Sequence, residues 1–197
     1  MFVQIIEGRV ADREALTRQV ERWSKEIRPG AKGFLGSTGG VTDDDRAIVL
    51  VRFESADAAR ANSDRPEQSQ WWAETEKCYD GPVSFTDSEE TETLSSGGSN
   101  DAGFVQVMKG RGDRARLREM DELFEKHAPS FRPDVLGGFR VWTAPDTYVE
   151  AIYFTSEAAA REGEKSEPPP ELAADMDDFQ AMMANVEFLD LRQPWLH

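Results

Sequence analysis

Four residues in one short stretch could hold an oxygen-bearing aromatic molecule. Asn62 and Arg65 can donate hydrogen bonds, and Trp71 and Trp72 follow in the same helical pattern, which Pro66 interrupts. An indole offers a flat wall to an aromatic ring, while an amide and a guanidinium stabilise a developing negative charge. The structural alternative is that either tryptophan packs in the core and that Asn62 ends a helical turn.

A second set of candidates lies in the other half of the chain. Arg140 and Trp142 differ by two positions, so on a strand they share a face and could line a pocket together. Tyr148, Tyr153 and His127 complete this set. His127 could act as a base or an iron ligand, but in the last turn of a helix a histidine also suits the negative end of the helix dipole.

The remaining reactive side chains have structural interpretations. A reactive thiolate needs a helix N-terminus or a neighbouring base, and Cys78 stands near the expected end of a helix, so we expect a packed thiol. His197 is the last residue, so we expect it to be frayed. The acidic groups in 43–45 and 175–178 lack the alternating ligand pattern of a calcium loop, so we interpret them as a turn and a solvated helix face.

Composition disfavours several classes of partner. Of 197 residues, 39% are hydrophobic, which is enough for a real core. The formal charge of −15 would repel a phosphate backbone and an anionic leaflet, so we expect neither nucleic acid nor membrane as a partner. One cysteine and two histidines give no internal disulfide and no zinc site, so we expect no metal and a reducing, cytoplasmic location. The chain shows no apolar run long enough for a membrane span, and its first residues lack the basic and apolar pattern of an export signal, so we expect neither.

The strongest pattern is an internal repeat with a spacing of about 102 residues. The segment Phe2–Arg9 (FVQIIEGR) matches Phe104–Arg111 (FVQVMKGR) along its whole length. Further along, we align Gly33-Phe34 with Gly138-Phe139. Insertions are then confined to loops, so we expect both copies to fold alike.

Each copy shows the same order of hydrophobic periods. A β-rich run leads into an amphipathic helix, two strands follow as a hairpin, and a proline-interrupted helix leads to a last strand. The expected strands are 2–9, 33–41, 46–54 and 82–87 in the first copy and 103–111, 137–144, 147–155 and 185–191 in the second. Asp12 and Asp113 are the expected N-caps of the first helices. The second helices open at Ser55 and Ser156 and continue to about residues 79 and 183.

This βαββαβ order is that of the ferredoxin-like unit, which carries both helices on one face of its sheet. Runs such as 48–51 (IVLV) are continuously apolar, as expected where both sheet faces are covered. We therefore predict an α+β fold in which tandem ferredoxin-like units, 1–87 and 102–197, pack sheet to sheet as an intrachain dimeric α+β barrel. Residues 88–101 are predicted to be a flexible linker. This intrachain pseudo-dimer needs no partner chain, and further self-association stays open.

The chain resembles the dimeric α+β barrel superfamily, and within it the antibiotic-biosynthesis-monooxygenase-like families, as two fused units. The resemblance covers nearly all of both halves. It is carried by the strand Phe2–Arg9, the helix end Arg28-Pro29-Gly30, the hairpin Gly33–Phe53 and the segment Ala61–Glu67 that leads to Trp71-Trp72.

The resemblance implies a pocket between a sheet and its helices. In the quinone-forming monooxygenases that the unit resembles, an Asn and a Trp on this helix, with an Arg or Tyr nearby, hold an aromatic substrate without metal or flavin. It therefore assigns Asn62, Arg65, Trp71 and Trp72 to substrate binding and implies no cofactor. Haem-degrading relatives ligate iron through a histidine in the second helical segment, and neither copy has a histidine there.

Two functions from different classes remain open. The first is a small-molecule-binding barrel that acts as a cofactor-independent monooxygenase on an aromatic or polyketide-like substrate. The second is a non-catalytic ligand-binding or structural barrel, because the sequence shows no titratable pair of the kind that general acid–base catalysis uses. The second copy has residues 164–170 (EKSEPPP) where the first has its polar and aromatic set, so we expect any small-molecule site in the first copy.

Overall fold

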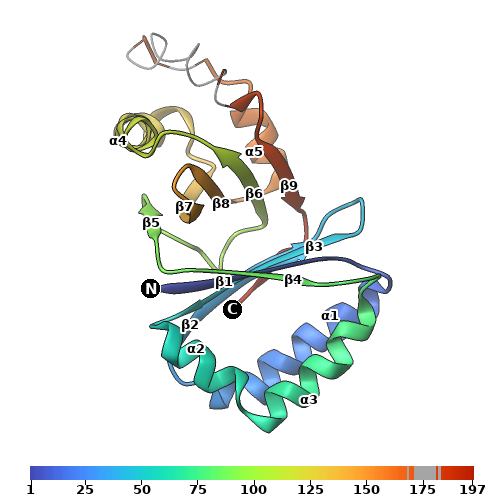
Figure 1. Cartoon of the computed structure of the whole chain (residues 1–197). Helices are drawn as coiled ribbons and strands as arrows, with labels where there is room; N and C mark the ends of the chain where they lie inside the picture. The colour runs from blue at the N-terminus through green and yellow to red at the C-terminus, as the bar shows by residue number, and fades with distance from the viewer. Residues whose placement is uncertain (168, 171–180, 182) are drawn as a thin grey trace. The chain divides into compact units, whose positions relative to one another are not determined.

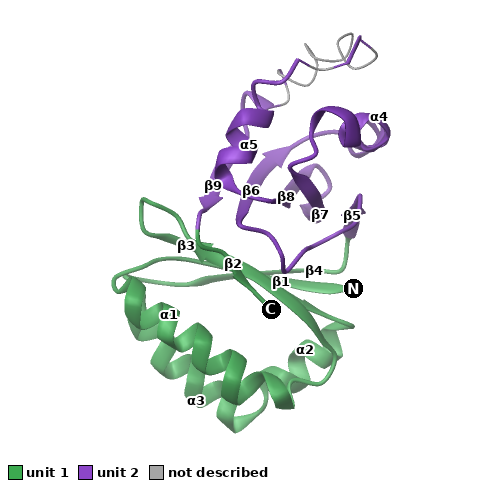
Figure 2. Cartoon of the chain, turned by 180° about the vertical axis from the view of Figure 1, so that it is seen from behind, with its two compact units in different colours: residues 1–90, 193–197 green, residues 91–192 purple. Residues whose placement is uncertain are grey.

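The structure is a computed structural model that describes every residue except 168, 171–180 and 182 (Figure 1). Much of the expected second helix of the second copy, including Asp175, Asp177 and Asp178, lies outside the described residues. The chain divides into two compact units (Figure 2): unit 1 is Met1–Glu90 with Gln193–His197, and unit 2 is Thr91–Arg192. Each unit is built on a five-stranded antiparallel sheet, so the predicted tandem ferredoxin-like architecture is confirmed.

The sheet of unit 1 has the strand order β10-β2-β3-β1-β4. Its strands are β1 (Phe2–Arg9), β2 (Phe34–Val41), β3 (Arg46–Phe53), β4 (Ser84–Ser88) and β10 (Trp195–Leu196), and its helices are α1 (Arg13–Arg22), α2 (Ala56–Ser63) and α3 (Pro66–Thr75). The three helices lie on one face of this sheet (Figure 1). Asp12 and Ser55 cap α1 and α2 by accepting backbone N–H groups, as the sequence predicts for Asp12.

Alternation along the strands of unit 1 divides the apolar residues between two faces. Phe2 and Phe53 pack with Ala59 of α2 on the helix-bearing face. Val3, Ile5 and other buried residues point the opposite way, where unit 1 places no helix of its own. That the two bare sheet faces pack against each other remains a prediction from the sequence.

The sheet of unit 2 has the order β5-β7-β8-β6-β9. Its strands are β5 (Thr91–Leu94), β6 (Phe104–Arg111), β7 (Val135–Ala144), β8 (Thr147–Phe154) and β9 (Glu187–Leu191), and its longer described helices are α4 (Arg114–Phe131) and α5 (Glu157–Gly163). Asp113 and Ser156 cap α4 and α5 in the same way as the first copy, which confirms the prediction for Asp113. None of the described helices is long and apolar enough to cross a membrane.

The ladders correct the alignment of the two hairpins. Phe34 pairs with Phe53 while Val135 pairs with Phe154, so the counterpart of Phe34 is Val135 and not Phe139. Both strands then have a β-bulge, whose register shift ends at Gly36 in one and Gly137 in the other. These glycines have φ angles of 150° and 145°, which side chains rarely adopt. The shared Gly-Phe dipeptide misled the alignment, because the bulge glycine and not the dipeptide fixes the register.

The predicted linker 88–101 is only partly irregular. Thr91–Leu94 form β5, which pairs antiparallel with β7 in unit 2. The composition of this segment, rich in Ser, Gly and acidic residues, hid the fact that its short alternating run could add an edge strand. Similarly, β10 pairs with β2, and His197 exchanges two backbone hydrogen bonds with Ser37 at 3.0 and 2.8 Å, so the expected fraying of His197 is wrong.

Candidate functional site

Arg65 organises the polar half of the predicted site in unit 1. Its Nη1 donates to Oδ1 of Asn62 at 2.9 Å and to the carbonyl of Ile27 at 3.1 Å. Its Nε and Nη2 donate to one carboxylate oxygen of Glu67 at 3.0 and 2.7 Å. A Cβ at Gly30 would lie 2.2 Å from this guanidinium, so the glycine leaves room for it. Arg65 is therefore held among α2, α3 and the helical turns at residues 23–30 that follow α1.

The aromatic half consists of packed indoles. Trp71 is 9% exposed, and its Nε1 donates to the carbonyl of Gln19 at 2.8 Å. The ring of Trp72 lies 5.9 Å from that of Trp71 and 5.2 Å from that of Phe85. Trp72 is half-buried, and its Nε1 has no hydrogen-bond partner among the described residues. The indole N–H of Trp71 is thus bonded to the backbone, whereas that of Trp72 is unpaired among the described residues.

The structure brings the four predicted residues into two contacting pairs. Ile27 connects them, because its carbonyl accepts from Arg65 and its side chain belongs to the apolar cluster of Trp71, against which Trp72 packs. Asn62 is 6% exposed, and its Nδ2 amide has no partner within the described part of the chain. Nδ2 of Asn62 and Nε1 of Trp72 are therefore unused donors among the four predicted residues.

No strong base stands out beside these donors in unit 1. Burial raises the pKa of Tyr79, which packs on Trp72, to about 12. Burial also raises the pKa of the Cys78 thiol, and Cys78 packs with Val10, Leu16 and other apolar residues, which confirms the predicted packed thiol. Unit 1 therefore offers hydrogen-bond donors and aromatic walls.

Unit 2 contains a cluster of charges around Arg140, and Arg140 is the only one of its four members that the sequence predicted. Arg140 of β7 is 2% exposed and is enclosed by three carboxylates. Its Nε donates to Glu150 of β8 at 2.6 Å, and its Nη2 also makes an ion-pair contact with that carboxylate. It donates to Asp121 of α4 through Nη1 at 2.6 Å and Nη2 at 3.0 Å, and to Glu92 of β5 through Nη1 at 3.3 Å. A guanidinium has five N–H donors, and four of them donate hydrogen bonds to these carboxylates here.

The environment separates the pKa values within this cluster. Burial raises the pKa of Glu150 to about 7, although Arg140 acts in the opposite sense. For Glu92, burial also acts to raise the pKa, but hydrogen bonds from Arg118 and Trp142 outweigh it and lower that pKa. Burial and the charge of Glu150 raise the pKa of Tyr148 to about 12. The cluster therefore joins a carboxyl group that titrates near neutrality to a tyrosine that stays protonated.

The equivalent positions of unit 1 are uncharged. In the corrected register Arg140 corresponds to Gly39, Glu150 to Val49, and Asp121 to Val20. Glu92 pairs with Arg140 on the edge strand, as Trp195 pairs with Gly39. All four charged members are thus specific to unit 2. Aligning the copies on their bulge glycines would have exposed this difference, whereas the Gly-Phe alignment concealed it.

The second set of sequence candidates divides accordingly. Arg140 and Trp142 share the helix-bearing face, as predicted, and the ring of Tyr148 lies 5.7 Å from that of Trp142. Tyr153 points to the opposite face, with its ring 6.3 Å from that of Phe139. His127 lies on α4, and its buried Nε2 has no hydrogen-bond partner in the described part of the chain.

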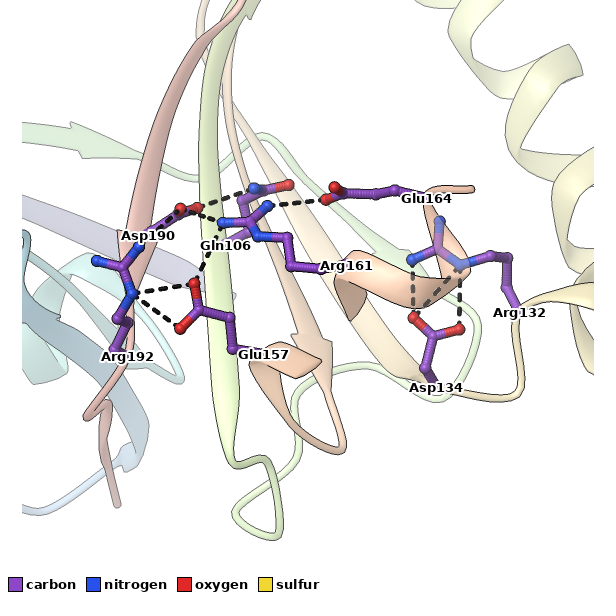
Figure 3. Close-up of polar contacts among 8 residues, drawn as sticks. All are labelled: Gln106, Arg132, Asp134, Glu157, Arg161, Glu164, Asp190 and Arg192. Carbon is purple, nitrogen blue, oxygen red and sulfur yellow. Dashed lines mark hydrogen bonds and ion pairs between the residues drawn. The ribbon is translucent and has the colours of Figure 1, made fainter. Parts of the chain in front are cut away.

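A separate ionic network ties α5 to β9 at the edge of unit 2 (Figure 3). Arg161 contacts Asp190 and donates to Glu164 at 2.8 Å, while Arg192 makes a bidentate contact with Glu157 at 2.9 and 2.8 Å. These side chains are between about a quarter and a half exposed, so the pairs are worth little individually. We interpret this network, called the latch below, as a structural link that holds α5 against β9.

Comparison with known proteins addresses the fold. No family model and no curated protein matches the sequence. Structures described as a putative monooxygenase, from Lactobacillus acidophilus and Fusobacterium nucleatum, both align with a TM-score of 0.71, at 13% and 9% identity. They cover 100% and 96% of this chain, and 98% and 90% of their own chains are covered. The chain has the fold of these monooxygenase-like proteins.

An anthrone oxidase-like protein aligns with a TM-score of 0.59 at 9% identity over 99% of this chain and 92% of that chain. Each alignment runs through both repeats, so the fused pair of monooxygenase-like units is a fold shared with solved structures. Identities this low establish the fold and leave the reaction to the residues of the chain.

Proposed function

We propose that this chain is a small-molecule-binding barrel that acts as a cofactor-independent monooxygenase on an aromatic or polyketide-like substrate. The proposed site lies on α2 and α3 of unit 1 and comprises Asn62, Arg65, Trp71 and Trp72. The monooxygenase-like fold and the anthrone oxidase-like structural neighbour support this class of substrate.

The observation that carries the proposal is the pair of unused donors, Nδ2 of Asn62 and Nε1 of Trp72. Arg65 fixes Asn62 by its Oδ1, which leaves the amide N–H groups in a defined direction. Neither nitrogen is among the fully buried unpaired atoms of the described residues, so both keep some contact with solvent and can donate to a ligand that carries an oxygen acceptor. Arg65 and Trp71 then act as positioning residues, because their own donors are engaged by the protein.

The reaction balances without a further reductant. A phenolate or enolate substrate gives two electron pairs to dioxygen, one oxygen atom forms a new carbonyl group, and the other leaves as water with two hydrogens of the substrate. The donors of Asn62 and Trp72 would stabilise the negative oxygen of the substrate while it reacts. This chemistry produces a quinone from a hydroxylated aromatic ring.

Calorimetric titration with a panel of hydroxylated anthracenes and naphthalenes tests the proposal. We expect Trp72→Ala and Asn62→Ala each to weaken binding by about 1–3 kcal/mol, the scale of a lost aromatic or hydrogen-bonding contact. Trp142→Ala, in unit 2, is the matched control and should leave affinity nearly unchanged. Mass spectrometry under labelled dioxygen would then detect an oxygen atom in the product. Binding that survives both unit 1 changes but disappears with Trp142→Ala would contradict the assignment.

One observation favours the second function, a non-catalytic barrel. Arg65 and Trp71 are satisfied by Glu67, Ile27 and Gln19 without any ligand, as expected of framework residues. If none of the panel binds and the same variants lower only the free energy of unfolding, the non-catalytic function is the correct one.

A further inference from the structure

Two polar atoms on β8 of unit 2, which belong to largely buried residues, have no hydrogen-bond partner among the described residues. Oε2 of Glu150 receives Arg140, but Oε1 makes no hydrogen bond among the described residues, although Glu150 is only 8% exposed. The hydroxyl of Tyr148, which is 4% exposed, likewise has no partner within the described part of the chain. Because the two residues differ by two positions, their side chains leave the sheet on the same face. Neither atom is among the fully buried unpaired atoms of the described residues, so both keep some contact with solvent, and a ligand could reach them.

Neighbouring charged residues hold the carboxylate of Glu150 in place, whereas none of them bonds to the hydroxyl of Tyr148. Arg140 holds Glu150 from the next strand and is itself held by Asp121 and Glu92. All three nitrogens of the Arg140 guanidinium already contact carboxylates, so this cation is neutralised within the protein. Within the cluster three carboxylates face Arg140 and Arg118, so the balance of charge favours a proton over an anion.

In unit 1 the positions equivalent to this cluster hold uncharged residues. The counterparts of Glu150 and Tyr148 are Val49 and Ala47, and Trp195 pairs across from the glycine that replaces Arg140. The same fold is therefore stable with apolar residues at every one of these positions. Replacing them together by a buried ionic cluster gains little stability, because desolvation offsets the Coulombic attraction. Because the cluster adds little to stability, its presence favours a chemical role.

We propose that Glu150 and Tyr148 form an acid–base site for a small enolisable or phenolic carbonyl compound. Oε1 of Glu150 accepts the proton as the C–H or O–H bond of the ligand breaks. The electron pair of that bond passes to the carbonyl oxygen of the ligand, which accepts a hydrogen bond from the hydroxyl of Tyr148. Return of the proton to the same or another ligand atom completes an exchange without any oxidant.

The two pKa values suit these roles. A carboxyl group that titrates at about 7 can both take and return a proton near neutral pH, and a tyrosine at about 12 remains a donor throughout. The charged groups that act on the Glu150 carboxyl are Arg140 of β7, Asp121 of α4 and Glu92 of β5. Of the other cations on α4, Arg118 pairs with Glu92 and Arg114 lies over the ring of Trp142. The site is separate from Asn62 and Trp72, so it extends beyond the function proposed for unit 1.

Hydrogen–deuterium exchange of an enolisable ketone tests this site in the intact chain. The probe is 2-tetralone in deuterated buffer without oxygen, followed by proton nuclear magnetic resonance. We expect the chain to accelerate exchange at the carbon next to the carbonyl, with a rate that rises through a pH of about 7. Glu150→Gln should lower the accelerated rate by about 10²-fold or more, and Tyr148→Phe should lower it less.

Matched variants separate chemistry from folding. Glu164→Gln removes a carboxyl group of the same unit outside the cluster and should leave the exchange rate unchanged. Glu150→Asp keeps a carboxyl group and should recover part of the rate. If the wild-type chain gives no acceleration, or if Glu150→Gln exchanges as fast as wild type, the acid–base site is wrong. Because the assay uses neither oxygen nor the unit 1 donors, either result leaves the proposed monooxygenase function to its own test.

Discussion

At the scale of single residues, the surroundings of a carboxyl group determine its behaviour more than its type does. Glu92 and Glu150 both contact Arg140, yet the pKa of Glu92 is lowered and that of Glu150 is raised. Glu92 also accepts from Arg118 and remains partly exposed, whereas Glu150 has Arg140 as its only partner among the described residues. Desolvation therefore prevails at Glu150.

This shift predicts how stability depends on pH. The pKa of Glu150 is about 7 in the folded state and about 4.5 in the unfolded chain, so between these values the folded state binds more protons. The free energy of unfolding should therefore fall as pH rises through this window and level off above it, by up to about 3 kcal/mol for a shift of this size. Urea unfolding from about pH 5 to 8 measures this slope.

The control for this prediction is Glu150→Gln, which removes the titration and should flatten the slope. His197 acts in the opposite sense, since burial and the charge of Arg28 lower its pKa, so its contribution to stability grows as pH rises. The difference between wild type and Glu150→Gln isolates Glu150 from His197. Parallel slopes for the two proteins would mean that Glu150 titrates as an ordinary exposed glutamate.

A second prediction concerns the partner of these carboxylates. Arg140→Met leaves three buried or half-buried carboxylates without their shared cation, and breaking such a buried pair costs about 3–5 kcal/mol. Arg161→Met removes an arginine that is 34% exposed from the latch between α5 and β9, and such exposed pairs are worth about 1 kcal/mol or less. Denaturant unfolding of both variants would compare the losses. Equal losses of unfolding free energy would show that Arg140 contributes no more to stability than a surface arginine.

At the scale of elements, hydrophobic period, caps and repeat predicted most of the fold. Local pattern predicted the order of elements along each repeat, the helix starts at Asp12 and Asp113, and the tandem units. Edge strands β5 and β10 did not, because a strand of two to four residues has little period of its own and takes its conformation from the neighbour with which it pairs.

For the candidate sites, the sequence predicted which nearby residues share a face but not which distant residues contact them. The spacing of Arg140 and Trp142 placed both on one face, but the carboxylates that enclose Arg140 come from three other elements. Nothing in the local sequence near Glu150 or Asp121 indicates that contact. Only the register of the two hairpins brings these positions together, and the register depends on the bulges at Gly36 and Gly137.

The bulge glycines give the prediction at this scale. A Cβ at Gly137, where φ is 145°, would lie 2.4 Å from the carbonyl oxygen of Gly97, so Gly137→Ala combines backbone strain with a clash against backbone. Gly81 has a φ of 91° and nothing within 4 Å of its would-be Cβ, so Gly81→Ala carries the strain alone. We expect a loss of about 1–2 kcal/mol for Gly81→Ala and clearly more for Gly137→Ala. Thermal unfolding would compare them, and a Gly137→Ala protein as stable as Gly81→Ala would contradict the steric argument.

At the scale of the whole molecule, the connections between repeats make each sheet depend on chain from beyond its own repeat. The chain passes from β4 in unit 1 to β5 in unit 2, and from β9 in unit 2 to β10 in unit 1. Trp195 of β10 packs against the cluster of Val10, Leu16, Ala47 and Cys78. The repeats are therefore linked by secondary structure as well as by covalent connection.

Separating the repeats should consequently damage both. A fragment of residues 1–90 lacks β10, which leaves the edge of β2 unpaired, and it retains an apolar sheet face, with Val3 and Ile5, that no helix of unit 1 covers. Exposed apolar faces and unpaired edges both favour association. We expect this fragment to self-associate or to unfold without cooperativity, as size-exclusion chromatography with light scattering and thermal unfolding would show. Adding residues 193–197 through a short glycine-serine linker should restore the edge but not cover the apolar face, so this second fragment should still self-associate. A monomeric fragment 1–90 that melts cooperatively would mean that unit 1 is a self-sufficient domain.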